Sequence, residues 1–191
     1  MRTNKVGFRA PVIVLLAIMT LMMVMMVTSF AGASDETDVR GIVQRVFQQL
    51  QSRDYAGVYD SLPSSTRSRM SRERFVNALK RSQDRYVLDR ISIGVVRVGG
   101  NVAVADTELY GRASQPFHAE GKIVVQQYLV REDGKWRVAT GDRTTIQRFL
   151  KSNPTFARKF PIRQPRAYVK QNGKWVEFKA PQLRTILDQV R

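Results

Sequence analysis

Two carboxylates, Asp106 and Glu108, stand two positions apart in the segment "NVAVADTELYG". Alternating β-branched and aromatic residues predict a strand here, and side chains two apart on a strand share one face. Such a pair could hold a general base whose pKa is set by burial and by its neighbour. Charges that alternate along a strand also occur where one face meets solvent, so both interpretations remain open.

His118 is the one histidine of the chain, and it follows "SQPF" in a segment that predicts a bend. It is a weak candidate acid or base, and an ordinary loop or edge position is the alternative. One His and no Cys cannot supply the usual zinc ligands. No Gly-rich phosphate loop and no Gly-x-Ser-x-Gly motif is present. The sequence therefore predicts neither a metal nor a cofactor.

A second set of side chains could line a pocket and orient a ligand by hydrogen bonds or ring contacts, without catalysis. The set is Tyr55, Tyr59, Gln127, Trp136 and Thr140. Packing in the core or at its rim is the alternative for each of them. If they bind anything, we expect a small apolar ligand or a protein partner.

Helices are expected before any strand. Apolar residues between 39 and 50 recur at helical spacing, and the acids at 35, 36 and 38 suit the positive end of a helix. The segment "RDYAGVYDSLP" predicts a short second helix that stops at Pro63. Ser71 can cap a third. The inner face of that third helix would carry Phe75, Val76 and Leu79.

From Tyr86 onward the apolar period changes to two, as in "YVLDRISIGVVRV" and "GKIVVQQYLVRE". Helices followed by strands predict an α+β domain, with the helices packed on one face of an antiparallel sheet. A three-residue loop at 99–101 sets the first register, and a two-residue turn at Asp133 and Gly134 sets the second. The predicted pairs are Val95 with Ala105, Ile93 with Thr107, Ile91 with Leu109, Leu129 with Val138, and Gln127 with Thr140.

The order of these elements, with "DYAGVYDSL" in the second helix and a closing "DGKWRV" hairpin, resembles the nuclear transport factor 2-like superfamily. The resemblance covers about residues 35–142. It implies a cone, in which helices wrap a strongly bent antiparallel sheet around a pocket, and similar domains often form homodimers through the sheet. It does not imply one chemistry, because the fold carries isomerases, dehydratases, ligand binders and interaction modules.

The sequence "DGKW" at 133–136 recurs as "NGKW" at 172–175, but the segments that flank the two copies differ. The chain is therefore predicted to contain two similar hairpin turns and no solenoid repeat. We therefore divide the chain into 1–33, 34–142 and an extension, 143–191. The extension is expected to hold a helix at "TTIQRFLKS", the second hairpin and a terminal helix. The apolar positions of that terminal helix are Leu183, Ile186, Leu187 and Val190.

Basic residues concentrate in the extension, which carries 12 Lys and Arg against 2 acids in a chain of net charge +16. Aromatic residues lie between them, a mixture that suits an anionic surface or nucleic acid. A solvated basic face is the alternative. The candidate surface residues are Arg158, Lys159, Arg163, Arg166, Lys170 and Lys174.

Residues 1–33 predict an export signal, because Arg2, Lys5 and Arg9 precede an uncharged apolar run over 11–30. The small residues up to Ala33 permit cleavage, while about 20 apolar residues are also enough for an uncleaved membrane anchor. Either outcome places the folded part outside the cytoplasmic membrane, secreted, periplasmic or anchored. Nucleic acid is then a poor partner, and anionic lipid or envelope polymer a better one.

Two functional hypotheses follow. The first is an exported or membrane-tethered, non-catalytic binding module of the bacterial cell envelope. The second is a small pocket enzyme of the isomerase or dehydratase type, with Asp106 or Glu108 as its general base; it requires one of these carboxylates to point into a closed pocket.

Overall fold

The computed structural model describes residues 34–83, 86–113 and 119–178. The chain divides into two compact units, Met1–Thr37 and Asp38–Arg191, and the contacts described below involve residues of the second unit. The predicted export segment, the bend around His118 and the predicted terminal helix lie outside the described residues. Within the described ranges, no helix has the length and apolar character that a membrane crossing requires.

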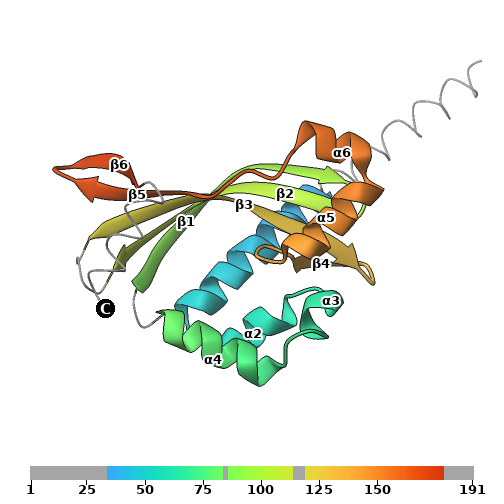
Figure 1. Ribbon diagram of the computed structural model, residues 1–191, viewed down its shortest axis with the longest axis horizontal. Coiled ribbons are helices and arrows are strands. Elements are labelled where there is room, and N and C mark those ends of the chain that lie inside the picture. The colour runs from blue at the N-terminus through green and yellow to red at the C-terminus, as the bar shows by residue number, and fades with distance from the viewer. Residues whose placement is uncertain (1–33, 84–85, 114–118, 179–191) are drawn as a thin grey trace, which may run out of the picture. The chain divides into compact units, whose positions relative to one another are not determined.

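Helices come first and strands follow, as predicted (Figure 1). A helix that includes residues 34–51 precedes α2 (Tyr55–Asp60), α3 (Ser64–Arg67) and α4 (Arg72–Gln83). The strands are β1 (Tyr86–Gly99), β2 (Val102–Ala113), β3 (Glu120–Glu132) and β4 (Lys135–Val138). After them come α5 (Arg143–Ser152), α6 (Pro154–Lys159), β5 (Arg166–Gln171) and β6 (Lys174–Phe178). The α+β class is confirmed, and α3 is an element that the sequence did not predict.

The six strands form one antiparallel sheet in the order β1-β2-β3-β5-β6, with β4 also paired to β3. The long strand β3 has two partners on the same edge. Its residues 121–124 pair with β5, and its residues 129–132 pair with β4. The second hairpin therefore extends the sheet rather than standing apart from it.

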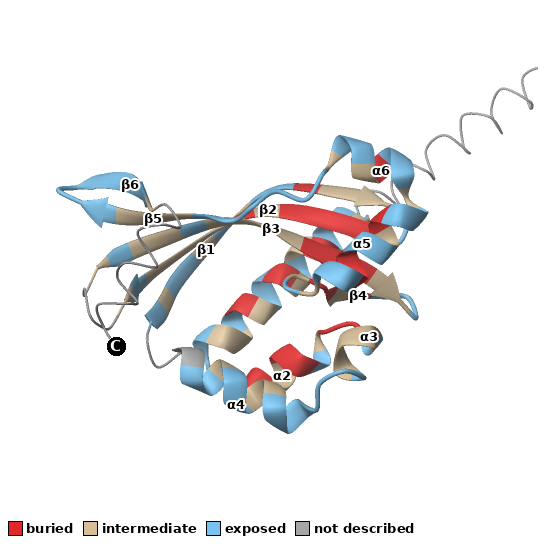
Figure 2. Cartoon of the chain, in the orientation of Figure 1, coloured by how far each residue is buried: buried red, intermediate tan, exposed pale blue. Residues whose placement is uncertain are grey.

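Helices cover both faces of the sheet, but only over part of it (Figure 2). On the face that we call the inner face, Val39 and Val43 of the N-terminal helix pack against Ala103, Ala105 and Leu129. On the opposite, outer face, a second cluster is built under α5 and α6. Its members are Val102, Val104, Tyr128, Val130, Ala139, Ile146, Leu150 and Phe156.

The loop between β1 and β2 holds two residues, because Gly99 pairs with Val102. The predicted three-residue loop is therefore wrong, and so is the pair of Val95 with Ala105. A bulge between Ile93 and Val96 shifts the register by one residue and leaves Val95 55% exposed. This shift restores two of the predicted pairs, which are confirmed: Ile93 with Thr107 and Ile91 with Leu109.

The N-terminal helix holds both bulges of β1 through two polar side chains. The guanidinium of Arg40 donates to the carbonyls of Ile93 (3.0 Å) and Gly94 (2.8 Å). The amide of Gln51 donates to the carbonyls of Leu88 (3.1 Å) and Asp89 (2.9 Å), at the second bulge. Arg40 and Gln51 are about 16 Å apart along a helix. The strand between the bulges rises by a similar length, at about 3.3 Å per residue.

Replacing Arg40 with alanine is expected to lower the free energy of unfolding by about 1–2 kcal/mol, because two bulge carbonyls lose a charged donor. Arg40→Lys should recover only part of this loss, since an ammonium cannot reproduce the two-pronged geometry. Urea unfolding followed by circular dichroism measures both. Arg45→Ala, on an exposed position of the same helix, is the matched control and should stay within about 0.5 kcal/mol. Equal losses at Arg40 and Arg45 would contradict this role.

Both predicted two-residue turns are confirmed. Asp133 and Gly134 have φ angles of 49° and 73°, and Asn172 and Gly173 have φ angles of 50° and 78°. Positive φ at both central residues is the geometry that a right-twisted hairpin of this length favours. The first hairpin also has the predicted pair of Leu129 with Val138.

Candidate functional site

A cavity of about 70 Å³ lies between the N-terminal helix and the inner face. Gln127 is the polar residue that lines it, and the other lining residues are Val43, Val46, Phe47, Leu50, Ile91, Leu109 and Val138. A water molecule takes about 30 Å³ in the liquid, whereas ligand pockets hold about 300–1,000 Å³. The cavity is thus too small for an ordinary metabolite, and no acid or base lines it.

Gln127 is the one predicted ligand residue that lines this cavity. Its amide nitrogen lies 3.4 Å from the hydroxyl oxygen of Thr107. That hydroxyl is buried and donates to the carbonyl of Val125 at 2.9 Å. The predicted pairing of Gln127 with Thr140 is not part of the ladder between β3 and β4, because β4 ends at Val138. Thr140 instead accepts a hydrogen bond from the N–H of Tyr128 at 3.0 Å.

The two predicted tyrosines hold the helices together. The Tyr59 hydroxyl lies 3.0 Å from the carbonyl of Arg67 and 2.9 Å from that of Met70, which closes the segment between α3 and α4. Its ring contacts Phe75 at 5.6 Å between centroids. Tyr55 is buried on α2. Neither tyrosine lines the cavity.

Trp136 belongs to the core of the inner face and is 5% exposed. The guanidinium of Arg131, its partner across the hairpin, lies 4.4 Å from the ring centroid. Trp136 is not among the residues that line the cavity. Its contacts are therefore those of a packed core residue.

Asp106 and Glu108 share one face, as predicted, but it is the outer face, opposite the cavity. Asp106 accepts from the guanidinium of Arg97 at 2.8 Å. Glu108 accepts from the hydroxyl of Tyr110 and lies 3.4 Å from the ammonium of Lys122. Their side chains are 33% and 39% exposed. The closed pocket that a catalytic carboxylate requires is thus missing at both positions.

The pKa of Glu108 is lowered, most strongly by the hydrogen bond from Tyr110. Burial has the next largest effect and raises this pKa, while the charge of Lys122 and its hydrogen bond lower it further. A general base that works near neutral pH needs a shift in the other direction. His118 lies outside the described residues. Among those residues, no group of three His, Asp or Glu side chains is placed to hold a metal ion.

Cations and aromatic rings alternate along a row on the outer face that the sequence analysis did not identify. The row runs across four strands through directly paired residues: Arg90, Tyr110, Lys122 and Tyr168. The ammonium of Lys122 lies 5.9 Å from the ring of Tyr110, 5.0 Å from Tyr168 and 5.7 Å from Trp175. Such contacts are favourable when the cation is partly removed from water. They fix the second hairpin to the sheet.

Four basic side chains lie along α6, the connector after it and the start of β5. We call this set the basic strip: Arg158, Lys159, Arg163 and Arg166. All four are exposed, and within the described part of the chain none forms an ion pair. Of the other predicted surface residues, Lys170 pairs with Glu120 at 2.7 Å, and Lys174 is exposed at the start of β6.

The segment between α6 and β5, which carries the centre of the basic strip, is hydrogen-bonded to the sheet at two points. The hydroxyl of Tyr128 donates to the carbonyl of Phe160 at 3.0 Å, and the N–H of Arg163 donates to the side-chain oxygen of Gln126 at 2.9 Å. Burial raises the pKa of Tyr128, so this phenol stays protonated and keeps donating at neutral pH. The strip is therefore held in place at its centre.

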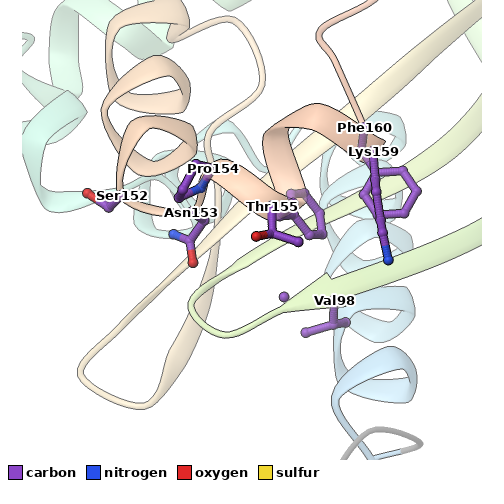
Figure 3. A pocket seen from close by; sticks show the side chains of 9 residues that line it. Val98, Ser152, Asn153, Pro154, Thr155, Lys159 and Phe160 are labelled. Atoms are coloured by element: carbon purple, nitrogen blue, oxygen red, sulfur yellow. The ribbon is translucent and has the colours of Figure 1, made fainter.

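An open groove of about 410 Å³ adjoins the strip (Figure 3). Val98 and Gly99 of β1 line one side, and residues 152–156 with Lys159 and Phe160 line the other. Gly99 is required here, because a Cβ at this position would lie 2.4 Å from the ring of Phe156. Lys159 gives the groove a cation, so it extends the basic surface.

Asp142 joins the helical layer to α5. Its carboxylate accepts from the N–H of Thr145 (3.0 Å), the hydroxyls of Thr145 (2.7 Å) and Thr66 (2.5 Å), and the guanidinium of Arg69. The side chain is 10% exposed. Burial raises the pKa of Asp142, but the hydrogen bonds from Thr66 and Thr145 and the charge of Arg69 together lower it by more. Asp142 thus anchors the start of the helix pair that carries the strip.

The chain matches no protein-family model and no curated protein sequence. Among solved structures, it is similar to Aln2 from a Streptomyces species, with 13% identity, 53% of this chain and 83% of that chain covered, and a TM-score of 0.39. It is also similar to an LEH-like epoxide hydrolase from M. tuberculosis, with 17% identity, 63% and 98% covered, and a TM-score of 0.38.

A third similar structure is a domain of unknown function with a cystatin-like fold from Nostoc punctiforme. The identity is 11%, 82% of this chain and 94% of that chain are covered, and the TM-score is 0.41. All three similarities are low, and no residue role or activity is transferred from them. The fold of this chain is a set of helices packed on a six-stranded antiparallel sheet.

Proposed function

We propose that this chain is an exported, non-catalytic interaction module of the bacterial cell envelope that contacts an anionic surface through the basic strip. The observation that carries this proposal is the strip itself. Four exposed cations without acidic partners in the described residues lie on α6, the connector after it and the start of β5, and hydrogen bonds fix this connector to the sheet. The predicted export segment would place the folded part outside the cytoplasmic membrane, where anionic lipid head groups are the nearest polyanions.

The free energy of binding to an anionic surface can be estimated from the charges of the strip. A basic residue near an anionic bilayer contributes about 1 kcal/mol, so four of them together are enough for measurable binding. Screening sets in beyond about 10 Å at 0.1 M salt. Binding through exposed side chains should therefore weaken steeply as salt rises.

The enzymatic alternative, an isomerase or dehydratase with Asp106 or Glu108 as base, has less support. Both carboxylates lie on the outer face in contact with cations, and the cavity behind the sheet holds about 70 Å³. A small apolar ligand would have to fit that same cavity. A protein partner or a homodimer through the sheet is a prediction that no contact described above favours.

Co-sedimentation of residues 34–191 with vesicles tests the proposal, because this part leaves out the predicted export segment. We expect binding to phosphatidylglycerol vesicles at about 20 mM salt, with most of it lost at about 150 mM. Neutral phosphatidylcholine vesicles should not bind. Failure to bind anionic vesicles at low salt would remove the membrane-surface proposal. Binding to a soluble anionic envelope polymer but not to vesicles would identify the polymer as the partner.

A further inference from the structure

The groove beside the basic strip combines apolar and polar side chains. Val98, Phe156 and Phe160 give it apolar surface, and Lys159 is its charged residue (Figure 3). The other polar residues that line it are Ser152, Asn153 and Thr155. No Asp or Glu of the described chain belongs to the lining. The groove therefore suits a ligand that has both an anionic group and an apolar part.

The walls of the groove are held by the protein's own contacts. Phe156 is 8% exposed, and its ring fills the space that a Cβ on Gly99 would need. The rings of Phe156 and Phe160 lie 4.8 Å apart between centroids. The side-chain amide of Asn153 donates to the carbonyl of Phe149 at 2.9 Å. A groove that is formed in advance lowers the entropic cost of binding a ligand.

Thr155 and Lys159 are placed to bind one anionic group together. They stand four residues apart on α6, and this spacing puts two side chains on the same side of a helix. A hydroxyl and an ammonium both donate hydrogen bonds, and phosphate oxygens accept them. Both side chains are exposed, and no ion pair within the described part of the chain involves Lys159. The pair therefore favours a phosphate group.

We propose that the groove binds the head region of a single anionic phospholipid. Its phosphate lies on Lys159 and Thr155, and the start of its acyl chains lies against Val98 and Phe160. This inference rests on the proposed function, because Lys159 belongs to both the groove and the basic strip. It adds a site for one lipid molecule to a surface that attracts many anionic charges.

The size and the surroundings of the groove favour a lipid over a free phosphate compound. Its volume of about 410 Å³ lies within the range of ligand pockets, about 300–1,000 Å³, and its apolar lining has no partner in a phosphate ion. Because the groove is open, the rest of a lipid can stay in the bilayer. The strip continues from Lys159 to Arg163 and Arg166, where phosphates of neighbouring lipids would lie. An anionic polymer has no acyl chain for the apolar side.

A photoreactive short-chain phosphatidylglycerol tests the location in the full chain. After irradiation and trypsin digestion, the adduct should fall on the peptides of residues 152–158 or 98–112, which contain the two walls. Unlabelled dihexanoyl phosphatidylglycerol should compete about tenfold better than glycerol phosphate, which lacks the chains, or dihexanoyl phosphatidylcholine, which has no net charge. Adducts spread over the chain without preference would overturn the proposal. Equal competition by glycerol phosphate would make a soluble phosphate the ligand and would also overturn it.

Thr155→Trp provides a second test, because it places an indole in the groove and leaves the net charge unchanged. Thr144→Trp, at an exposed position of α5 outside the groove, is the matched control. By isothermal titration of the full chain with dihexanoyl phosphatidylglycerol, Thr155→Trp should lower affinity about tenfold or more, while Thr144→Trp stays within about twofold of wild type. Circular dichroism checks that both variants are folded. Equal affinities of the two variants would contradict the lipid site.

The vesicle assay separates this inference from the proposed function. Thr155→Trp should still bind phosphatidylglycerol vesicles at low salt, because all the cations of the basic strip remain. If wild type binds these vesicles but the two tryptophan variants bind the short-chain lipid equally, the lipid site fails and the surface contact stands. If wild type does not bind anionic vesicles, the proposed function fails, and this inference fails with it.

Discussion

Replacing Asp142 with alanine is expected to lower the free energy of unfolding by about 3 kcal/mol, among the larger effects of a single substitution. The loss of an N-cap costs about 1 kcal/mol, and the buried hydroxyl of Thr145 and the guanidinium of Arg69 lose their charged partner. Urea unfolding followed by circular dichroism and by tryptophan fluorescence gives the measurement. Glu73→Ala, at an exposed acid in the first turn of α4, is the control and should change stability by less than about 0.5 kcal/mol.

The stabilisation by Asp142 should depend on pH in a defined direction. Its pKa is lowered in the folded chain, so the carboxylate stabilises the fold fully above its unfolded pKa, which is about 3.9. This contribution is lost as the pH falls through the lower, folded pKa. The difference in stability between wild type and Asp142→Asn should therefore shrink below about pH 4. A difference that stays constant from neutral pH down to about pH 3 would show that the charge is not responsible.

Neutralising the basic strip should have the largest effect on binding. With Arg158, Lys159, Arg163 and Arg166 all changed to glutamine, we expect affinity for anionic vesicles to fall by about 100- to 1,000-fold. The estimate follows from about 1 kcal/mol per basic residue and about 1.4 kcal/mol per factor of ten. Stability should change little, because the side chains are exposed and Arg163 holds the sheet through its backbone N–H.

The sequence specifies elements well where the signal is local. The stripe of the N-terminal helix, the cap at Ser71, which accepts from the N–H of Arg74 at 3.4 Å, and both Gly-containing turns follow from spacing and turn chemistry. The bulge beside Val95 does not, because distant Arg40 binds its carbonyls. A regular ladder therefore predicts the wrong loop, although it predicts the pairs beyond the bulge correctly.

The face on which a strand residue lies is a harder problem. Period two shows that Asp106 and Glu108 share a face, but not which face meets the cavity. In "VAVA" at 102–105 every residue is buried, because helices cover both faces there. That run of apolar residues without alternation was the available signal that β2 is covered on both sides. The pairing of β5 with β3 is set by contacts remote in sequence, so the row through Lys122 could not be anticipated.

A comparison of two fourfold variants with equal net charge tests the central claim most directly. The first is the strip variant, and the second changes Arg45, Arg74, Lys80 and Arg81, which are exposed on the N-terminal helix and α4. Affinity of residues 34–191 for phosphatidylglycerol vesicles is measured by co-sedimentation at about 20 mM and about 150 mM salt. If the strip is the contact surface, the strip variant loses binding at both salt concentrations while the second variant stays within about threefold of wild type, as expected for charges beyond a Debye length. Equal losses in the two variants would show that only net charge matters, and the basic strip would then not be a binding site.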